Sequence, residues 1–310
     1  MDQVRDISNI QELIESIHQA EEFLSPNFLL IILGPTASGK TKLAVKLAQA
    51  MGAEIISADS RQVYKQLDIG TGKDLIEYQD IPFHLIDIVE PNENFNVELF
   101  RQGFQKAFLE IKHRGKLPIL CGGTGSYIQS ILQEQTYSQV PKDKELQVEL
   151  SLLSKEALIE RINQINIPEE FNIDWNSHKR LVRALEILLY LEHHPVPERK
   201  GQLVKDFMIL GLSPDREIRR ARIDKRLESR MEEGLLTEVE GLLEQGISHE
   251  QLQWFGLEYK YASLHLLDEL TLEEFTEKLR TEIHRFAKRQ MTYFRKMEKD
   301  GLKIHWINVL

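Results

Sequence analysis

Eight consecutive residues of this chain have the types and the spacing of a phosphate-binding loop. They follow the pattern G-x-x-x-x-G-K-[ST] and are Gly34, Pro35, Thr36, Ala37, Ser38, Gly39, Lys40 and Thr41. In such a loop the glycines let several backbone N–H groups point into one hollow, the following helix adds the positive end of its dipole, and the lysine adds a charge. The Thr41 hydroxyl can hold Mg²⁺. The loop therefore predicts that this chain binds a di- or triphosphate together with Mg²⁺.

Polar residues also follow two other predicted strands. A strand at 53–58 leads into four of them, Asp59, Ser60, Arg61 and Gln62. A strand at 117–121 leads into a glycine-rich turn that contains Thr124. Ligands of an open parallel sheet bind at the carboxyl ends of its strands, so these side chains belong near the phosphate loop. Asp59 fits a Mg²⁺ ligand or an ordinary helix N-cap, and Asp87 competes for the metal role.

Alternating strand and helix patterns predict an α/β fold. An apolar strand at 28–33 precedes the phosphate loop, and residues 28–135 and 206–310 together predict a mostly parallel sheet flanked by helices. Residues 136–205 predict an inserted small helical subdomain, and residues 1–27 predict one amphipathic helix as an N-terminal extension. The other predicted elements are a strand at 83–89, helices at 97–112, 215–245 and 271–298, and a last strand at 303–309.

The composition is that of an ordinary soluble protein. The chain has 310 residues, 42% hydrophobic and 28% charged, and contains no apolar run near the roughly 18 residues that span a bilayer. Its one cysteine, Cys121, rules out an internal disulfide and fits a reducing cytosol. A net charge of -10 argues against a protein that coats nucleic acid non-specifically.

Two stretches reverse this acidic balance locally. Residues 216–230 contain seven basic and three acidic side chains, and residues 284–296 contain five basic side chains and no acid. Such stretches are either solvated helix faces or the places where an acidic protein binds an anion.

Six strings that occur in a fixed order make the chain recognisable. They are GPTASGKT at 34–41, ISADSRQVYKQLDIGTGK ending at Lys73, HLIDIVEP at 84–91, GGTGSYIQSIL at 122–132, KRLVRALEI at 179–187 and KRQMTYFRK at 288–296. Together they closely resemble the tRNA dimethylallyltransferases, also called tRNA isopentenyltransferases. The resemblance runs from about residue 28 to residue 296.

The resemblance implies a reaction that composition and spacing do not show. The phosphate loop would hold dimethylallyl diphosphate rather than ATP. The enzyme would move the dimethylallyl group to N6 of adenosine 37, next to the anticodon, in tRNAs that read codons starting with U, and would release diphosphate. The zinc-finger tail of the eukaryotic members has no counterpart here. We therefore expect a bacterial-type, cytoplasmic, monomeric enzyme that uses Mg²⁺, with the tRNA anticodon stem-loop as its partner and no membrane.

The resemblance also implies roles for single residues. Asp59 matches the family's general base, Thr124 matches the threonine that lines the channel where donor and adenine meet, and Arg222 best matches the arginine that binds diphosphate. The dense basic run around Arg222 leaves its neighbours Arg219 and Arg226 open for that role. The residues expected to contact tRNA are Asp59, Ser60, Arg61, Gln62, Lys179, Arg180, Arg183, Lys288, Arg289, Gln290 and Arg295.

Three departures from the family pattern concern tRNA more than prenyl chemistry. The order of residues at 254–260 is altered, the insert is short, and residues 1–27 match nothing in the family. Three other functions stay open: a prenyltransferase that acts on free AMP or ADP, a P-loop kinase or NTPase, and a non-catalytic RNA-binding protein. The basic stretch at 288–296 and the insert favour RNA, and the intact loop with Asp59 favours an enzyme.

Overall fold

The chain divides into two compact units. The computed structural model describes residues 5–7, 9–134, 137, 140–169, 171–196 and 201–309. Unit 1 comprises Met1–Leu132 and Leu203–Leu310, and unit 2 comprises Gln133–Gln202. Unit 2 begins and ends three residues earlier than the insert expected at 136–205. It ends earlier because the N–H of Leu203 bonds to the carbonyl of Ile131, and Val204 packs in the core of unit 1.

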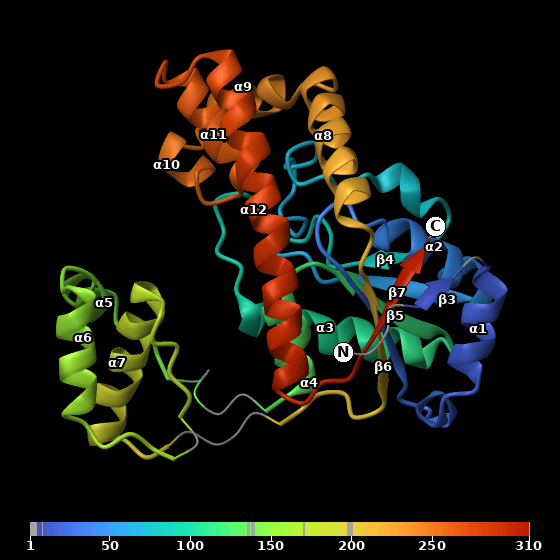
Figure 1. Cartoon of the computed structure of the whole chain (residues 1–310), viewed down its shortest axis with the longest axis horizontal. Coiled ribbons are helices and arrows are strands. Elements are labelled where there is room, and N and C mark those ends of the chain that lie inside the picture. The colour runs from blue at the N-terminus through green and yellow to red at the C-terminus, as the bar shows by residue number, and fades with distance from the viewer. Residues whose placement is uncertain are drawn as a thin grey trace. The chain divides into compact units, whose positions relative to one another are not determined.

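Unit 1 is built on a parallel sheet. Its seven strands lie in the order β1-β7-β6-β2-β5-β3-β4, and every pair is parallel. The strands are β1 (Arg5–Ile7), β2 (Leu29–Leu33), β3 (Ala53–Ser57), β4 (Phe83–His84), β5 (Leu117–Gly122), β6 (Phe207–Leu212) and β7 (Ile304–Val309). This arrangement, with helices on both faces, confirms the predicted fold class (Figure 1).

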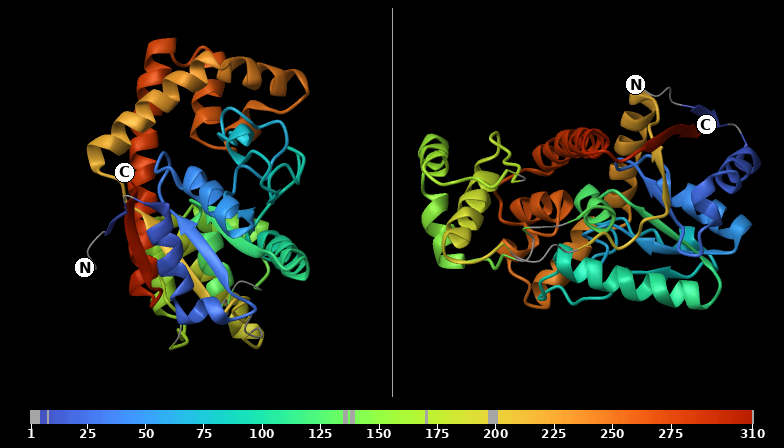
Figure 2. Two further views of the ribbon diagram at one scale, coloured as in Figure 1. Left: turned by 90° about the vertical axis from the view of Figure 1, so that its right-hand side faces the viewer. Right: turned by 90° about the horizontal axis from the view of Figure 1, so that it is seen from below.

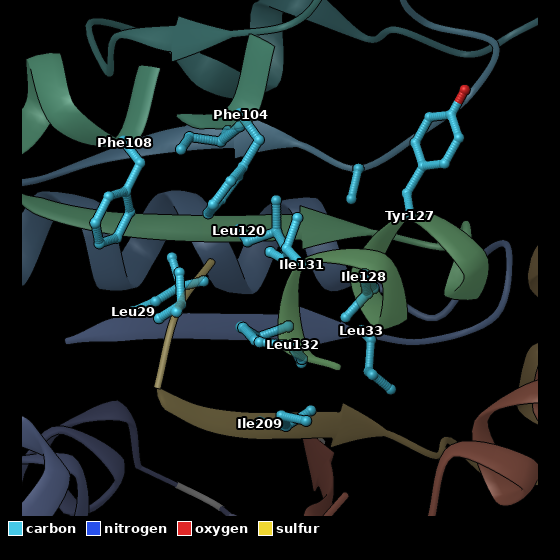
Figure 3. Close-up of a cluster of buried hydrophobic side chains, with 14 of the residues drawn as sticks. Leu29, Leu33, Phe104, Phe108, Leu120, Tyr127, Ile128, Ile131, Leu132 and Ile209 are labelled. Atoms are coloured by element: carbon cyan, nitrogen blue, oxygen red, sulfur yellow. The ribbon is translucent and has the colours of Figure 1, made fainter. Parts of the chain in front are cut away.

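Two cores cover the two faces of the sheet, because successive residues of a strand point to opposite sides. Leu29, Ile31 and Leu33 of β2 pack in one core with α3 (Val97–His113) and α4 (Gly125–Leu132). Figure 3 looks onto this face of the sheet, over which Phe104 and Phe108 of α3 lie with Leu29 and Leu120 of the strands. Residues of β2 that point the other way, Leu30 and Ile32, pack with α1 (Ile10–His18) and α2 (Lys40–Met51).

The prediction of a single N-terminal helix over residues 1–27 is wrong. Residues 5–7 form a strand that pairs with β7, α1 follows at Ile10–His18, and a 3-10 turn covers Glu21–Leu24. Apolar residues at helical spacing occupy only 10–17, and Asn9 starts the helix there by accepting a hydrogen bond from the N–H of Gln11. The described part of the segment is therefore joined to unit 1, by the pairing of residues 5–7 with β7 and by the buried side chains of α1.

A layer of helices stands at one end of the sheet (Figure 1; Figure 2, left). Its members are α8 (Arg216–Glu232), α9 (Leu235–Glu244), α10 (His249–Leu252), α11 (Leu257–Leu266) and α12 (Leu272–Lys299). The helix predicted at 215–245 is two helices, because Gly234 takes φ 98° between them. The five helices α8 to α12 share a third apolar core with residues 63–67 of the loop after β3. The far end of α12 packs on α4 through Phe294 and Met297.

The strand β4 is shorter than predicted. The strand predicted at 83–89 ends at His84, because Leu85 and Asp87 take positive φ angles of 63° and 55°. A 3-10 turn precedes it at Leu75–Tyr78.

Unit 2 has its own apolar core between α5 (Lys144–Ser151), α6 (Lys155–Asn163) and α7 (His178–His193). Within the described residues, no helix combines the length and the hydrophobicity needed to cross a bilayer.

A buried carboxylate ties the amino end of β3 to α3 and β4. Glu54 is 5% exposed, and its oxygens accept hydrogen bonds of 2.9 and 2.7 Å from the guanidinium of Arg114. His84 Nε2 lies 2.8 Å from Oε2 of the same carboxylate. The hydrogen bonds from Arg114 hold the pKa of Glu54 below its usual value.

We expect Glu54→Gln to lower the free energy of unfolding at pH 7 by about 1–2 kcal/mol, since Arg114 is itself half-exposed and screened. A carboxyl whose folded pKa is depressed stabilises above its unfolded pKa, about 4.3 for Glu, and loses that contribution as the pH falls through the folded value. Urea unfolding between about pH 7 and pH 3 should therefore show wild type and variant converging at the acid end. The exposed Glu240→Gln is the control, and a pH-independent difference would exclude the ion pair as the source.

Candidate active site

The phosphate loop lies at the carboxyl end of β2 and lines a cavity of about 490 Å³. Its backbone is tightly constrained. Gly39 takes φ 87° at the N-cap of α2, and Ala37 takes φ 58°, which is uncommon for a residue with a side chain. A Cβ on Gly34 would lie 2.6 Å from the Ser38 hydroxyl and 3.2 Å from Leu212. The loop thus has the curled backbone that the motif predicts.

Two polar side chains of the loop form no hydrogen bond or ion pair with the part of the chain that the structure describes. Lys40 is half-buried, and burial lowers the pKa of its ammonium group. The Ser38 hydroxyl is buried, and among the described residues it has no hydrogen-bond partner. A cation and a hydroxyl held away from water both gain when an anion arrives, so the loop is suited to a phosphate.

Asp59 and Thr124 line the same cavity from two neighbouring strands. Asp59 follows β3, and one of its carboxylate oxygens accepts a 2.9 Å hydrogen bond from the N–H of Arg61. The Thr124 hydroxyl oxygen accepts from the N–H of Ser60 at 3.1 Å, and the N–H of Thr124 donates to the carbonyl of Ala58 at 3.1 Å. These bonds hold the ends of β3 and β5 together.

Three arginines of α8 face the loop at a spacing of four residues, which places them on one side of the helix. Arg222 borders a second cavity of about 610 Å³ that shares Lys40 and Thr41 with the first. Its guanidinium is 3.9 Å from the point where a Cβ on Gly39 would lie, and no described side chain pairs with it. The other two arginines are engaged. Arg226 bonds to Asp74 and to the carbonyl of Gly72, and Arg230 pairs with Glu258 at 2.6 Å. Among these three arginines, Arg222 is therefore the one available to an anion.

Asp87 does not share the cavity with the phosphate loop. Its carboxylate pairs with the buried ammonium group of Lys73, which also bonds to Asp68 at 2.6 Å and to the carbonyl of Tyr64 at 2.7 Å. The side chain is thus part of the support for the loop after β3. Asp87 accordingly does not fit the role of metal ligand for which it competed with Asp59.

Glu238 of α9 supports the same loop and was not identified from the sequence. Its carboxylate accepts hydrogen bonds of 2.7–3.0 Å from three backbone N–H groups, those of Asp68, Ile69 and Gly70, and one of 2.6 Å from the Tyr259 hydroxyl. The supported loop lines the cavity with Gly70, Thr71 and Gly72. A surface glutamate in the middle of an amphipathic helix gives no local signal of such a role.

The helix α12 closes one wall of the cavity. Phe286, Arg289, Gln290 and Tyr293 line it, and the Arg289 guanidinium lies 5.9 Å from the centre of the Phe286 ring. Lys288, Arg289 and Arg295 are exposed, as a nucleic-acid contact requires. Gln290 differs from them because it is buried and both ends of its amide bond to other parts of the chain.

Comparison with known proteins identifies the family. The protein-family model described as "IPP transferase" matches residues 62–297 of this chain. The chain is 46% identical over 282 residues to tRNA dimethylallyltransferase 1 of Geotalea uraniireducens (strain Rf4), a match that covers 90% of this chain and 92% of the relative. This chain belongs to the IPP transferase family. A second relative, tRNA dimethylallyltransferase 2 of Shewanella sediminis (strain HAW-EB3), is 44% identical over 279 residues, covering 90% and 92% of the two chains.

Solved structures agree with this assignment to the IPP transferase family. The full-length tRNA isopentenylpyrophosphate transferase of Bacillus halodurans superposes with a TM-score of 0.67 at 34% identity, over 91% of this chain and 90% of that one. A eukaryotic dimethylallyltransferase, described in crystallographic snapshots as acting on tRNA, gives a TM-score of 0.72 at 28% identity. That match covers 91% of this chain and 73% of the eukaryotic one.

The remaining residues expected to contact tRNA differ in their availability in this member of the family. Arg61 is exposed and borders the cavity, whereas Gln62 bonds to Ser57 and to the carbonyl of Gly72. In unit 2, Lys179 and Arg180 are exposed, and Arg180 pairs with Asp174. Arg183 is turned inward, where it bonds to Glu186 and to the carbonyls of Val140 and Pro141.

The residues present fit a Mg²⁺ ion that is shared with substrate. Among the described residues, no group of three His, Cys, Asp or Glu side chains is placed to hold a metal. Mg²⁺ keeps several waters and takes one or two protein ligands, with substrate phosphates supplying other oxygens. The Thr41 hydroxyl borders both cavities beside the phosphate loop, which fits this kind of site.

We expect Lys40→Ala and Arg222→Ala each to weaken binding of inorganic pyrophosphate by about tenfold or more, because each removes a cation next to the phosphate loop. Isothermal titration with Mg²⁺ and pyrophosphate measures the effect. Arg220→Ala, an exposed residue of the same helix that lines neither cavity, is the control. If the affinity is unchanged in Arg222→Ala but falls in Arg226→Ala, the contact with diphosphate belongs to Arg226, one helical turn further along α8.

Proposed function

We infer that this chain is a tRNA dimethylallyltransferase. It transfers the dimethylallyl group of dimethylallyl diphosphate to N6 of adenosine 37 in tRNA and releases diphosphate. One observation carries the inference: the phosphate loop, Asp59 and Thr124 line a single cavity in a member of the IPP transferase family. The relatives named tRNA dimethylallyltransferase, at 44–46% identity over nine-tenths of the chain, support it.

The donor side of the site has to stabilise a leaving anion. As the bond between the prenyl carbon and the diphosphate oxygen breaks, negative charge grows on the diphosphate. The loop N–H groups, Lys40 and Arg222 are placed to stabilise that charge, and groups fixed in advance are the most effective. When bound, Mg²⁺ would neutralise part of the same charge, with Thr41 as its protein ligand.

The acceptor side has to remove a proton from a weak nucleophile. The exocyclic amine of adenine is delocalised into the ring, so N6 becomes acidic only as its bond to the prenyl carbon forms. We assign Asp59 as the general base that takes this proton. Its first oxygen is oriented by the N–H of Arg61, and its second oxygen forms no hydrogen bond within the described part of the chain. Thr124 lies at the end of the neighbouring strand, and we propose that it orients the adenine.

The tRNA has to present a base that is out of its stack. Adenosine 37 lies in a single-stranded loop, so turning it into the cavity costs only a few kcal/mol, which contacts elsewhere must offset. Lys288, Arg289 and Arg295 are exposed on α12, with Arg289 at the cavity wall, and they suit phosphates of the anticodon stem-loop. Phe286, beside Arg289, adds an aromatic surface on which a base can stack. We propose that one copy of the chain suffices for this reaction.

The test is direct. Incubating the protein with Mg²⁺, unmodified tRNA and labelled dimethylallyl diphosphate, then digesting the RNA to nucleosides, should yield one labelled adenosine derivative modified at N6. Parallel reactions replace tRNA by AMP or ADP, or the donor by ATP. Labelled AMP with unlabelled tRNA would instead identify a prenyltransferase of free nucleotides, and ATP turnover without tRNA would identify a P-loop NTPase.

Replacing Asp59 with Asn should slow single-turnover transfer by roughly 10²–10⁴-fold, because the amide cannot accept the N6 proton. The amide oxygen can still accept from Arg61, so pyrophosphate affinity should stay within about twofold. Rapid-quench transfer and pyrophosphate titration are measured side by side, with the exposed Asp80→Asn as the control. A rate loss below tenfold would remove Asp59 from the base role, and collapse of pyrophosphate binding would make it a metal ligand.

Replacing Lys288, Arg289 and Arg295 together with Gln should raise KM for tRNA and leave donor affinity unchanged. Each cation that contacts a phosphate contributes roughly 0.7–0.9 to the slope of log K against log salt, so that slope should flatten accordingly. The control variant replaces Lys106, Lys116 and Lys303, which are exposed in unit 1 but do not line the cavity. An unchanged slope would mean that the three residues of α12 form a solvated face.

A further inference from the structure

Gln290 is a buried side chain that joins two loops of the active site. It lies on α12 and is 9% exposed. Its amide oxygen accepts a 2.8 Å hydrogen bond from the N–H of Thr36, in the phosphate loop. Its amide nitrogen donates a 3.0 Å hydrogen bond to the carbonyl of Gly123, in the turn after β5. The contact with tRNA expected for this residue stays a prediction, and both ends of its amide are bonded inside the protein.

The two partners require a side chain that both donates and accepts at its end. One partner is a donor and the other is an acceptor, and the side chains of this length that offer both are Gln and, when protonated, Glu. The approach is close, because a Cβ on Gly123 would lie 2.4 Å from the amide nitrogen of Gln290. Gly123 therefore has to be glycine for this contact to form.

The two joined loops serve the two substrates. Thr36 belongs to the loop proposed to hold the donor's diphosphate, and Gly123 directly precedes Thr124 on the acceptor side. A transfer reaction depends on the distance and angle between donor carbon and acceptor nitrogen, and small displacements cost large factors in rate. Beyond the pairing of β2 with β5, a single amide from a third element links these two loops.

We propose that Gln290 is a positioning residue of the transfer reaction, holding the donor loop and the acceptor turn at the separation that the reaction needs. This inference rests on the proposed function. It predicts a loss in the chemical step that exceeds the loss in binding of either substrate, since each loop keeps its own binding groups.

The test compares two variants at saturating donor and tRNA. Gln290→Met keeps the length of the side chain and removes both hydrogen bonds, so kcat should fall by about ten- to a hundredfold while pyrophosphate affinity changes less than threefold. Gln290→Glu supplies a pH-dependent rescue. Its ionised form accepts from Thr36 but repels the carbonyl of Gly123, whereas its protonated form accepts with one oxygen and donates with the other.

Burial raises the pKa of a carboxyl group, so protonation of the introduced Glu should occur within a workable range. The kcat of Gln290→Glu divided by that of wild type should therefore rise as the pH falls from about 8 to about 6. Dividing by wild type cancels the pH dependence that variant and wild type share. The same ratio should stay flat for Gln290→Met and for Gln105→Glu, an exposed residue of α3.

The outcomes separate the possible failures. A folded Gln290→Met variant with unchanged kcat overturns the inference. Equal, pH-independent losses in the Met and Glu variants, accompanied by a lower Tm, also overturn it and leave Gln290 as a structural residue. If Gln290→Met does not fold, the pH ratio of Gln290→Glu decides alone. Absence of transfer by wild type overturns the proposed function, and the inference with it.

Discussion

The site depends on the pairing of three parallel strands. β5 lies between β2 and β3, and the registers Leu33↔Gly122 and Ser57↔Cys121 bring their carboxyl ends to the same edge. Neighbouring strands are about 4.8 Å apart, so the segments that leave these ends have to share one small volume. The phosphate loop, Asp59 and Thr124 are those segments. Gly122 shows how tight the meeting is, since a Cβ there would lie 2.2 Å from the carbonyl oxygen of Ala58.

The strand ends line only one side of the cavity, and the helical layer lines its other sides. The loop that follows β3 has little regular structure of its own, and it is held by charged side chains, of which Lys73 is buried. Glu238 binds its backbone N–H groups, Lys73 binds its carboxylates, and Arg226 binds the carbonyl of Gly72. Both Arg226 and Arg230 approach Gly72 so closely that a Cβ there would lie 2.0 Å from each guanidinium. Tertiary contacts therefore hold the loop in place, and α9 supports the active site through this loop without lining the cavity.

Prediction from sequence succeeded where the signal is local. The phosphate loop, the buried strand before it and the long helix α12 follow from motif and periodicity, and the fold class follows from their order. It failed where the decisive partner is distant along the chain. The partners of Gln290, Glu238 and Asp87 are 254, about 170 and 14 residues away, and nothing in their neighbours indicates them. The N-terminal strand was missed for the same reason, because residues 5–7 become a strand only by pairing with β7.

Whether a cation of this protein is available to an anion depends on its own ion pairs rather than on the net charge of the chain. The chain carries a net charge of -10, yet its site has to bind an anionic donor and a polyanionic RNA. Arg222, Arg226 and Arg230 repeat at the same spacing on one helix, but carboxylates engage the second and third of them. An arginine that is already paired gains little from a new anion, because forming the new contact requires breaking the old one. The same helix therefore holds a loop with two of its cations and leaves Arg222, next to Gly39, for the proposed contact with the diphosphate.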